Sequence, residues 1–154
     1  MSLRIEDLGL APKMEAVARD GAERFGPIVV FLSGRRTRAG QARAMALNIV
    51  RGGRRWIAAT YRPSGPSLAL QTWVDQHPSI TDASRLTSGL AGVMARFSDD
   101  ELAALSRHMT GKAFDLQPVP NPAGAVLHAY LSTHPGIRVL DTEGGLVRWH
   151  VQEA

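Results

Sequence analysis

The stretch "IRVLDTEGGLVRWHVQ", residues 137–152, constrains the fold of this chain more than any other segment. Two runs of β-type residues flank Thr142-Glu143-Gly144-Gly145, a sequence typical of the turn of a β-hairpin. Because side chains alternate along a strand, residues 146, 148, 150 and 152 are expected to share one face. His150 can then point toward a cleft while Trp149 and Val151 pack into the core.

Two further segments are predicted to be strands, and helices are predicted around them. "PIVVFLS" (27–33) is a short apolar run that suits a buried strand, and "AFDLQPV" (113–119) suits another. Apolar residues at helical spacing, with start and stop signals, predict helices over 11–25, 38–53, 67–76, 81–97, 99–105 and 123–133. The expected fold class is therefore α+β, a small antiparallel sheet with flanking helices.

The composition bounds the number of domains and the kinds of site. A chain of 154 residues can bury a core of its own, so we expect a single domain over residues 1–154. The chain has no cysteine, so any metal must be held by histidine, aspartate or glutamate. A net charge of +4 fits a solvated surface, or an attraction to a polyanion such as a cell-wall polymer or nucleic acid. No sequence signature of a nucleic-acid-binding fold accompanies that charge.

The histidines divide into two groups. Three of the five are expected to be structural, at helix ends, in a helix or in a loop: His77, His128 and His134. His108 and His150 differ, because both lie beside predicted strands that can meet in one sheet. Together with Asp115 they make a complete set of three ligands for a catalytic zinc ion, which leaves a fourth position for water.

Three motifs in this order carry a resemblance to a known family. "SRHMTGKAFD" (106–115) fits the pattern S-x-H-x-x-G-x-A-x-D, and "SGRRTRAGQ" (33–41) resembles S-G-Y-R-S-x-x-x-Q. Downstream, "RWHV" resembles the W-H-x segment that bears the last metal ligand. The chain resembles the zinc D-alanyl-D-alanine carboxypeptidase and dipeptidase family, whose fold is shared by the hedgehog signalling domain and by phage endolysins that cut L-alanyl-D-glutamate bonds. The resemblance covers residues 27–45 and 104–153 and leaves 54–100 as a helical insertion.

The resemblance implies a role for each matching residue. The ligands of a Zn²⁺ ion would be His108, Asp115 and His150. Gly111 would permit the tight turn between the first two ligands, and Ala113 would keep that turn free of bulk. Arg36 would bind a substrate carboxylate or the oxyanion of the transition state, and Gln41 and Ser106 would contact substrate. Zinc would polarise the scissile carbonyl and lower the pKa of its bound water.

The family's general base has no counterpart at the usual positions. Many members carry a glutamate three positions before the last histidine, where this chain has Val147. Another pattern places an aspartate two positions after it, where this chain has Gln152. Glu143 in the hairpin turn is the candidate for a catalytic base, with a solvated turn residue as the alternative. The other open candidates are Glu153, Asp75, Asp82, Asp99 and Asp100.

The expected function is that of a zinc-dependent peptidase acting on peptidoglycan stem peptides, as a D,D-carboxypeptidase or an endopeptidase. The alternatives are a catalytically silent zinc-binding domain and an assembly module, for instance of a phage tail. The N-terminal "MSLRIEDLGLAPKMEAVARDG" has no long apolar run and predicts neither a signal peptide nor a membrane span. We therefore expect a monomer made in the cytoplasm that acts on the cell wall after release or export, with no nucleic-acid partner.

Overall fold

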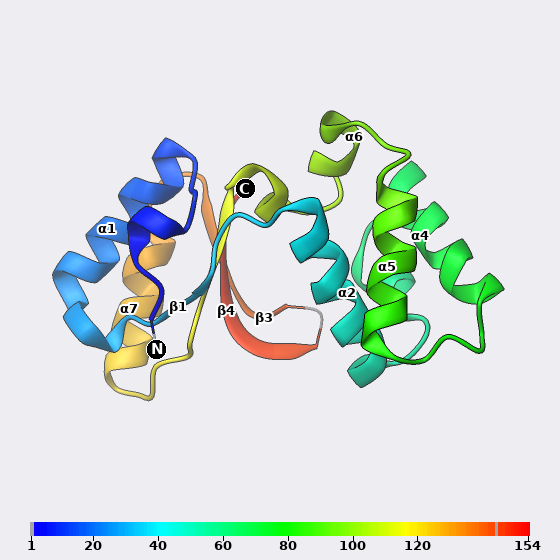
Figure 1. Cartoon of the computed structure of the whole chain (residues 1–154). Coiled ribbons are helices and arrows are strands. Elements are labelled where there is room, and N and C mark those ends of the chain that lie inside the picture. The colour runs from blue at the N-terminus through cyan, green and yellow to red at the C-terminus, as the bar shows by residue number, and fades with distance from the viewer. Residues whose placement is uncertain (1, 144) are drawn as a thin grey trace. The chain divides into compact units, whose positions relative to one another are not determined.

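The computed structural model describes residues 2–143 and 145–154 and has the expected α+β architecture (Figure 1). Within these residues four antiparallel strands form one sheet in the order β1-β2-β4-β3. The strands are β1 (Phe31–Ser33), β2 (Ala113–Leu116), β3 (Ile137–Glu143) and β4 (Leu146–Glu153). β2 and β4 therefore occupy the middle of the sheet, where each has a hydrogen-bonded strand on both sides.

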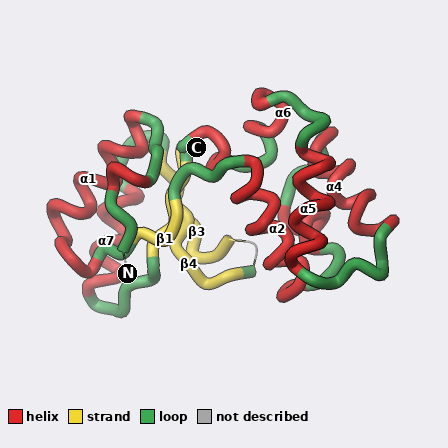
Figure 2. Tube along the Cα trace, in the orientation of Figure 1, coloured by secondary structure: helices red, strands yellow, loops and turns green. Residues whose placement is uncertain are grey.

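The chain divides into two compact units. Residues up to Arg35 and from Thr110 onward form the first, called here the sheet unit, and residues from Arg36 to Met109 form the second, called the helical unit. All strands of the described chain belong to the sheet unit, as the yellow segments of Figure 2 show. The expected zinc-peptidase-like domain over residues 1–154 would comprise both units and stays a prediction.

In the sheet unit, one face of the sheet packs against two helices, α1 (Pro12–Phe25) and α7 (Ala123–Ser132). α1 begins with a proline, which is favoured in the first helical turn, and ends at Gly26, whose φ of 66° suits a residue without a Cβ. The buried core joins both helices to the strands through Leu8, Met14, Val17, Ala18, Val29, Phe31, Phe114, Leu116, Leu127, Leu131, Ile137, Trp149 and Val151. The prediction that Trp149 and Val151 face the core is confirmed.

The two predicted strands outside the hairpin are shorter than expected. A 3₁₀ turn, η2 (Gly26–Ile28), occupies the start of the predicted 27–33 strand, because Gly26-Pro27 favours a turn. β2 ends at Leu116. The next residue, Gln117, still donates its backbone N–H to the carbonyl of Val30. Pro118 follows and has no N–H to continue the ladder. The pairing of β1 with β2 is thus short.

The C-terminal hairpin is confirmed, but its turn is narrower and its ladder less regular than predicted. β3 continues through Thr142 and Glu143, so only residues 144–145 separate the strands, and Gly144 lies outside the described residues. Leu140 pairs with His150 and Thr142 with Val147, so a step of two residues on β3 matches a step of three on β4. Such a β-bulge interrupts strict alternation.

The bulge changes which side chains share a face. Directly paired residues of antiparallel strands project their side chains to the same side. Val147 therefore lies on the face of His150, and Leu146, which pairs with Glu143, lies on the other. The expectation that residue 146 shares the face of His150 is wrong, because the extra residue shifts the alternation by one.

The helical unit contains α2 (Arg38–Gly52), α3 (Trp56–Thr60), α4 (Gly65–Gln76), α5 (Ala83–Met94) and α6 (Asp99–Ala103), followed by the 3₁₀ turn η3 (Arg107–Thr110), whose last residue belongs to the sheet unit. The helical character expected for 54–100 is confirmed, although α3 was not predicted. The segment 27–45, which carries part of the family resemblance, extends into α2. The apolar face of α2 joins the core of the helical unit, formed by Ala42, Met45, Ala46, Ile49, Trp56, Ile57, Leu70, Val74, Leu86, Leu90, Val93, Met94, Leu102 and Leu105.

Side-chain caps start helices of this unit, α5 and α6 among them. Ser98 and Glu101 form a capping box at the start of α6. Asp82 caps α5 by accepting the N–H of Arg85, and this hydrogen bond, with the Arg85 guanidinium, lowers the pKa of the Asp82 carboxyl. No helix of the described chain has both the length and the apolar character that a membrane span requires.

Candidate metal centre

A row of paired residues across the sheet forms the base of the candidate site. Ser33 of β1 pairs with Asp115 of β2, Asp115 pairs with His150 of β4, and His150 pairs with Leu140 of β3. Because paired residues project to the same side, Ser33, Asp115 and His150 lie on the face opposite the Trp149 and Val151 core. The register of three strands thus brings together residues that are far apart in the sequence.

His108 lies in η3 and completes the group. Its side chain is fully buried, and Ser106 Oγ accepts the His108 N–H at 3.3 Å, which helps to fix the turn that carries the ring. Single ligand atoms of His108, Asp115 and His150 all lie within 4.8 Å of one another. The three residues that the sequence proposed as metal ligands are therefore brought together.

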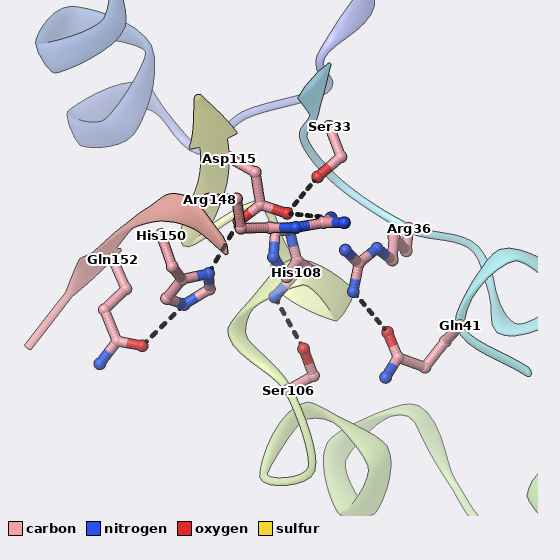
Figure 3. A network of polar contacts seen from close by, with 9 residues as sticks. All are labelled: Ser33, Arg36, Gln41, Ser106, His108, Asp115, Arg148, His150 and Gln152. Carbon is pink, nitrogen blue, oxygen red and sulfur yellow. Dashed lines mark hydrogen bonds and ion pairs between the residues drawn. The ribbon is translucent and has the colours of Figure 1, made fainter. Parts of the chain in front are cut away.

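Hydrogen bonds orient the aspartate and the second histidine (Figure 3). Asp115 Oδ2 accepts the hydroxyl of Ser33 at 2.6 Å, and Asp115 Oδ1 lies 3.0 Å from His150 Nδ1. On the far side of the same ring, His150 Nε2 lies 2.9 Å from the Gln152 side-chain oxygen. When Nε2 carries the proton and donates it to Gln152, Nδ1 is left with a lone pair for a metal ion beside Asp115.

The donor set fits a divalent metal ion. Two imidazoles and one carboxylate are ligands that zinc and related transition metals prefer. Zinc bonds of about 2.0 to 2.2 Å place tetrahedral ligand atoms about 3.5 Å apart, so atoms within 4.8 Å of one another would reach one ion after small side-chain movements. Asp115 is fully buried and pairs with Arg148 at 3.4 Å, and a divalent cation would add to the compensation of its charge. A buried group of His108, Asp115 and His150 could therefore bind a metal ion.

Small residues of the central motif have the positions that this geometry requires. Gly111 has a φ of 73°, and a Cβ at this residue would lie 2.7 Å from the carbonyl oxygen of Gly9. Only glycine fits there without a shift of the backbone. Ala113 is buried and pairs with Gln152, so its small side chain stands beside the amide that contacts His150.

Arg36 and Gln41 lie at the start of the helical unit. The backbone N–H of Arg36 donates to the carbonyl of His108 at 2.9 Å, which ties the arginine to the turn that carries a candidate ligand. The Arg36 guanidinium donates to Gln41 Oε1 at 3.4 Å, and Gln41 Nε2 donates to the hydroxyl of Tyr61 at 2.9 Å. Gln41 is fully buried, so its hydrogen bonds support Arg36. The substrate roles of Arg36, Gln41 and Ser106 stay predictions.

The candidate general base lies at the end of the hairpin. Glu143 pairs with Leu146, four residues before His150 on β4, which corresponds to about 13 Å along a strand. Val147 lies nearer, shares the face of His150 and has 78% of its surface exposed. The role of Glu143 stays a prediction. Among the alternatives, Asp82 caps a helix and Asp99 pairs with Arg38.

The other histidines make contacts typical of structural residues. His77 Nδ1 lies 2.7 Å from the carbonyl oxygen of Trp73 at the end of α4, as expected for a capping residue. His128 pairs with Asp141 at 2.8 Å, and His134 pairs with Asp20 at 3.2 Å. Sequence reasoning missed Arg148, which lies 3.4 Å from Asp115, because only the register of the sheet reveals that contact.

No protein-family model, curated protein or solved structure matches this chain.

Proposed function

We propose that this protein is a zinc-dependent peptidase that acts on the stem peptides of peptidoglycan. The observation that carries the proposal is the buried group of His108, Asp115 and His150, whose ligand atoms lie within 4.8 Å of one another. A zinc ion bound there would act as a Lewis acid toward a peptide carbonyl and would make a water molecule acidic enough to attack it.

The residues around the group support this chemistry. Ser33 and Gln152 hold Asp115 and His150 in the orientation that a metal requires. Arg36 would bind a substrate carboxylate or the developing oxyanion, with Gln41 fixing its guanidinium and Ser106 near the same turn. A monomer released from the cytoplasm toward the cell wall, as endolysins are, would be the acting form.

The second candidate function is zinc binding without catalysis. The observation that favours it is the identity of the two residues at the family's acidic positions. Val147 cannot accept a proton, and Gln152 is neutral and already contacts His150 Nε2. A positioned base adds about 100- to 10,000-fold to a hydrolytic rate, so its loss would leave a weak or silent enzyme.

Metal analysis and a peptidoglycan digest together test both functions. The purified chain is expected to contain one zinc per molecule and to release peptides or D-alanine from muropeptides, as read by mass spectrometry. Zinc at full occupancy without any cleavage would favour the silent binding domain. A chain that takes up no zinc when it is supplied would rule out both functions and favour the assembly module.

A further inference from the structure

Arg148 belongs to the site, yet neither the motifs nor the resemblance gives it a role. Because Leu140 pairs with His150 and Thr142 with Val147, Arg148 and Trp149 together oppose Asp141. Bulges of this kind turn one side chain out of the normal alternation. Trp149 keeps its place in the core, and the Arg148 guanidinium reaches toward Asp115, with Nη1 3.4 Å from Oδ2 (Figure 3).

The guanidinium of Arg148 is incompletely satisfied by the protein. Its side chain is only 24% exposed, and its 3.4 Å contact with Asp115 is longer than the usual range of about 2.7 to 3.2 Å for a hydrogen bond. Its Nε is buried and has no hydrogen-bond partner among the described residues. Arg54 in the helical unit is different, because it donates to the carbonyls of Val74, His77 and Ile80. A buried donor without an acceptor is costly, and a ligand can supply the acceptor.

The charge of the sheet face indicates what kind of ligand this is. With two neutral imidazoles, Asp115 is the one negative ligand of the candidate metal centre. Its charge is opposed by Arg148 and, once loaded, by a divalent cation. The loaded centre is therefore net positive and attracts an anion. A guanidinium offers parallel donors whose geometry matches the two oxygens of a carboxylate.

We propose that Arg148 binds a carboxylate of the substrate beside the metal centre. This inference rests on the proposed function for its choice of a peptide carboxylate as the anion. It makes Arg148 a specificity-determining residue that favours peptides with a free carboxylate near the scissile bond. Arg36 would then be left for the second of its two expected roles, at the oxyanion.

Calorimetry on the zinc-loaded full chain tests the assignment without requiring turnover. The probes are N-acetyl-D-alanine and its uncharged amide. The variants are Arg148→Gln, Arg148→Lys and, as a matched control, Arg138→Gln. Arg138 is exposed and pairs with Gln152, so its loss removes the same charge from the same face of the sheet. Zinc content is measured for each variant.

We expect Arg148→Gln to weaken binding of the acid about 10- to 100-fold and to leave binding of the amide and the zinc content unchanged. Arg138→Gln should behave like the wild-type chain. Unchanged affinity of Arg148→Gln for the acid would overturn the proposal, as would equal affinity of the wild type for acid and amide. Loss of zinc from a folded Arg148→Gln variant would also overturn it, because the arginine would then serve Asp115.

If Arg148→Gln does not fold, Arg148→Lys decides, since lysine keeps the charge beside Asp115 but lacks the paired donors. A loss of about tenfold for the acid supports the proposal, and wild-type affinity contradicts it. Failure of the wild type to cleave muropeptides, with carboxylate binding intact, would count against the peptidase function and leave the role of Arg148 standing.

Discussion

Gln71 in the helical unit and the Asp115–His150 pair on the sheet face are buried polar groups with different hydrogen-bond partners. In the helical unit, Gln71 accepts the backbone N–H of Ala58 at 3.0 Å and donates to the backbone carbonyl of Arg54 at 2.9 Å. On the sheet face, the hydrogen bonds of Asp115 and His150 run to other side chains, those of Ser33 and Gln152 among them. The hydrogen bonds of Gln71 to backbone join the α3 and α4 segments of the fold. We propose that the side-chain hydrogen bonds of Asp115 and His150 instead orient these residues for a ligand.

The largest expected effect is on zinc binding at the sheet face, and it comes from removing a candidate ligand. His108→Ala should abolish tight zinc binding and all metal-dependent activity, because two remaining ligands hold zinc weakly. Zinc should also cease to raise the melting temperature of the variant. Metal content by mass spectrometry and thermal melting with and without a chelator measure both effects. His128→Gln is the control, and full occupancy in His108→Ala would refute the ligand assignment.

The next effect concerns the general base. If Glu143 supplies it, Glu143→Gln should lower turnover by about 100- to 10,000-fold and leave zinc affinity intact, because Glu143 is not one of the ligands. Steady-state rates on muropeptides, with zinc titrations in parallel, give the answer. Unchanged turnover would remove Glu143 from the mechanism.

Val147→Glu tests the opposite change, because it adds a carboxylate at a position where the resembling family has its base. The bulge puts residue 147 on the face of His150, where it is exposed to water, so a glutamate there has the position that a base needs. A sharp rise in turnover would identify the natural protein as a weakened member of the resembling family. No rise, together with no loss in Glu143→Gln, would point to a base elsewhere in the chain.

A smaller effect is expected at Arg36. Arg36→Ala should depress activity about 100-fold, the scale of losing one oxyanion partner, and should leave the melting temperature nearly unchanged. Arg36 belongs to the helical unit, yet we expect its side chain to bind substrate. The variant therefore tests whether a residue outside the sheet unit contributes to activity without contributing to stability. Activity assays and thermal melts decide, and a variant that unfolds or stays fully active would contradict the prediction.

The smallest effect should appear in stability alone. Gln71→Leu removes the hydrogen-bond partners of the Ala58 N–H and the Arg54 carbonyl, which are partly buried, and should cost about 1 kcal/mol of the free energy of unfolding. Zinc affinity should not change. Urea denaturation and zinc titration measure the two quantities separately. A Gln71→Leu variant that loses zinc while keeping its stability would contradict the view that Gln71 serves the fold and not the ligand.

Local patterns in the sequence were enough for much of the fold and, together with the family resemblance, for the three candidate ligands. Helical spacing and caps predicted α1, α4, α5, α6 and α7 to within a few residues, because these signals act within one turn of chain. The motif around Gly111 indicated His108 and Asp115 as candidate ligands, and the W-H segment of the hairpin indicated His150.

What the sequence missed depends on pairing between distant segments. The bulge exists only in the register of β3 against β4, so neither the shared face of Val147 and His150 nor the reach of Arg148 could be predicted from alternation. The attachment of α2 to the helical unit depends on partners in α5, and nothing within α2 identifies them. Short helices such as α3 carry too few turns for a periodic signal.

At the β-bulge between β3 and β4, two residues of β4, Arg148 and Trp149, lie opposite one residue of β3. Deleting Arg148 would leave Leu140 opposite the histidine and Thr142 opposite Val147, with unbroken alternation between them. A deletion of one residue at this point would therefore remove Arg148, the proposed anion-binding residue, without changing a core residue. A one-residue insertion or deletion there would keep the pairing of Asp115 with His150 and change only the proposed specificity of the site.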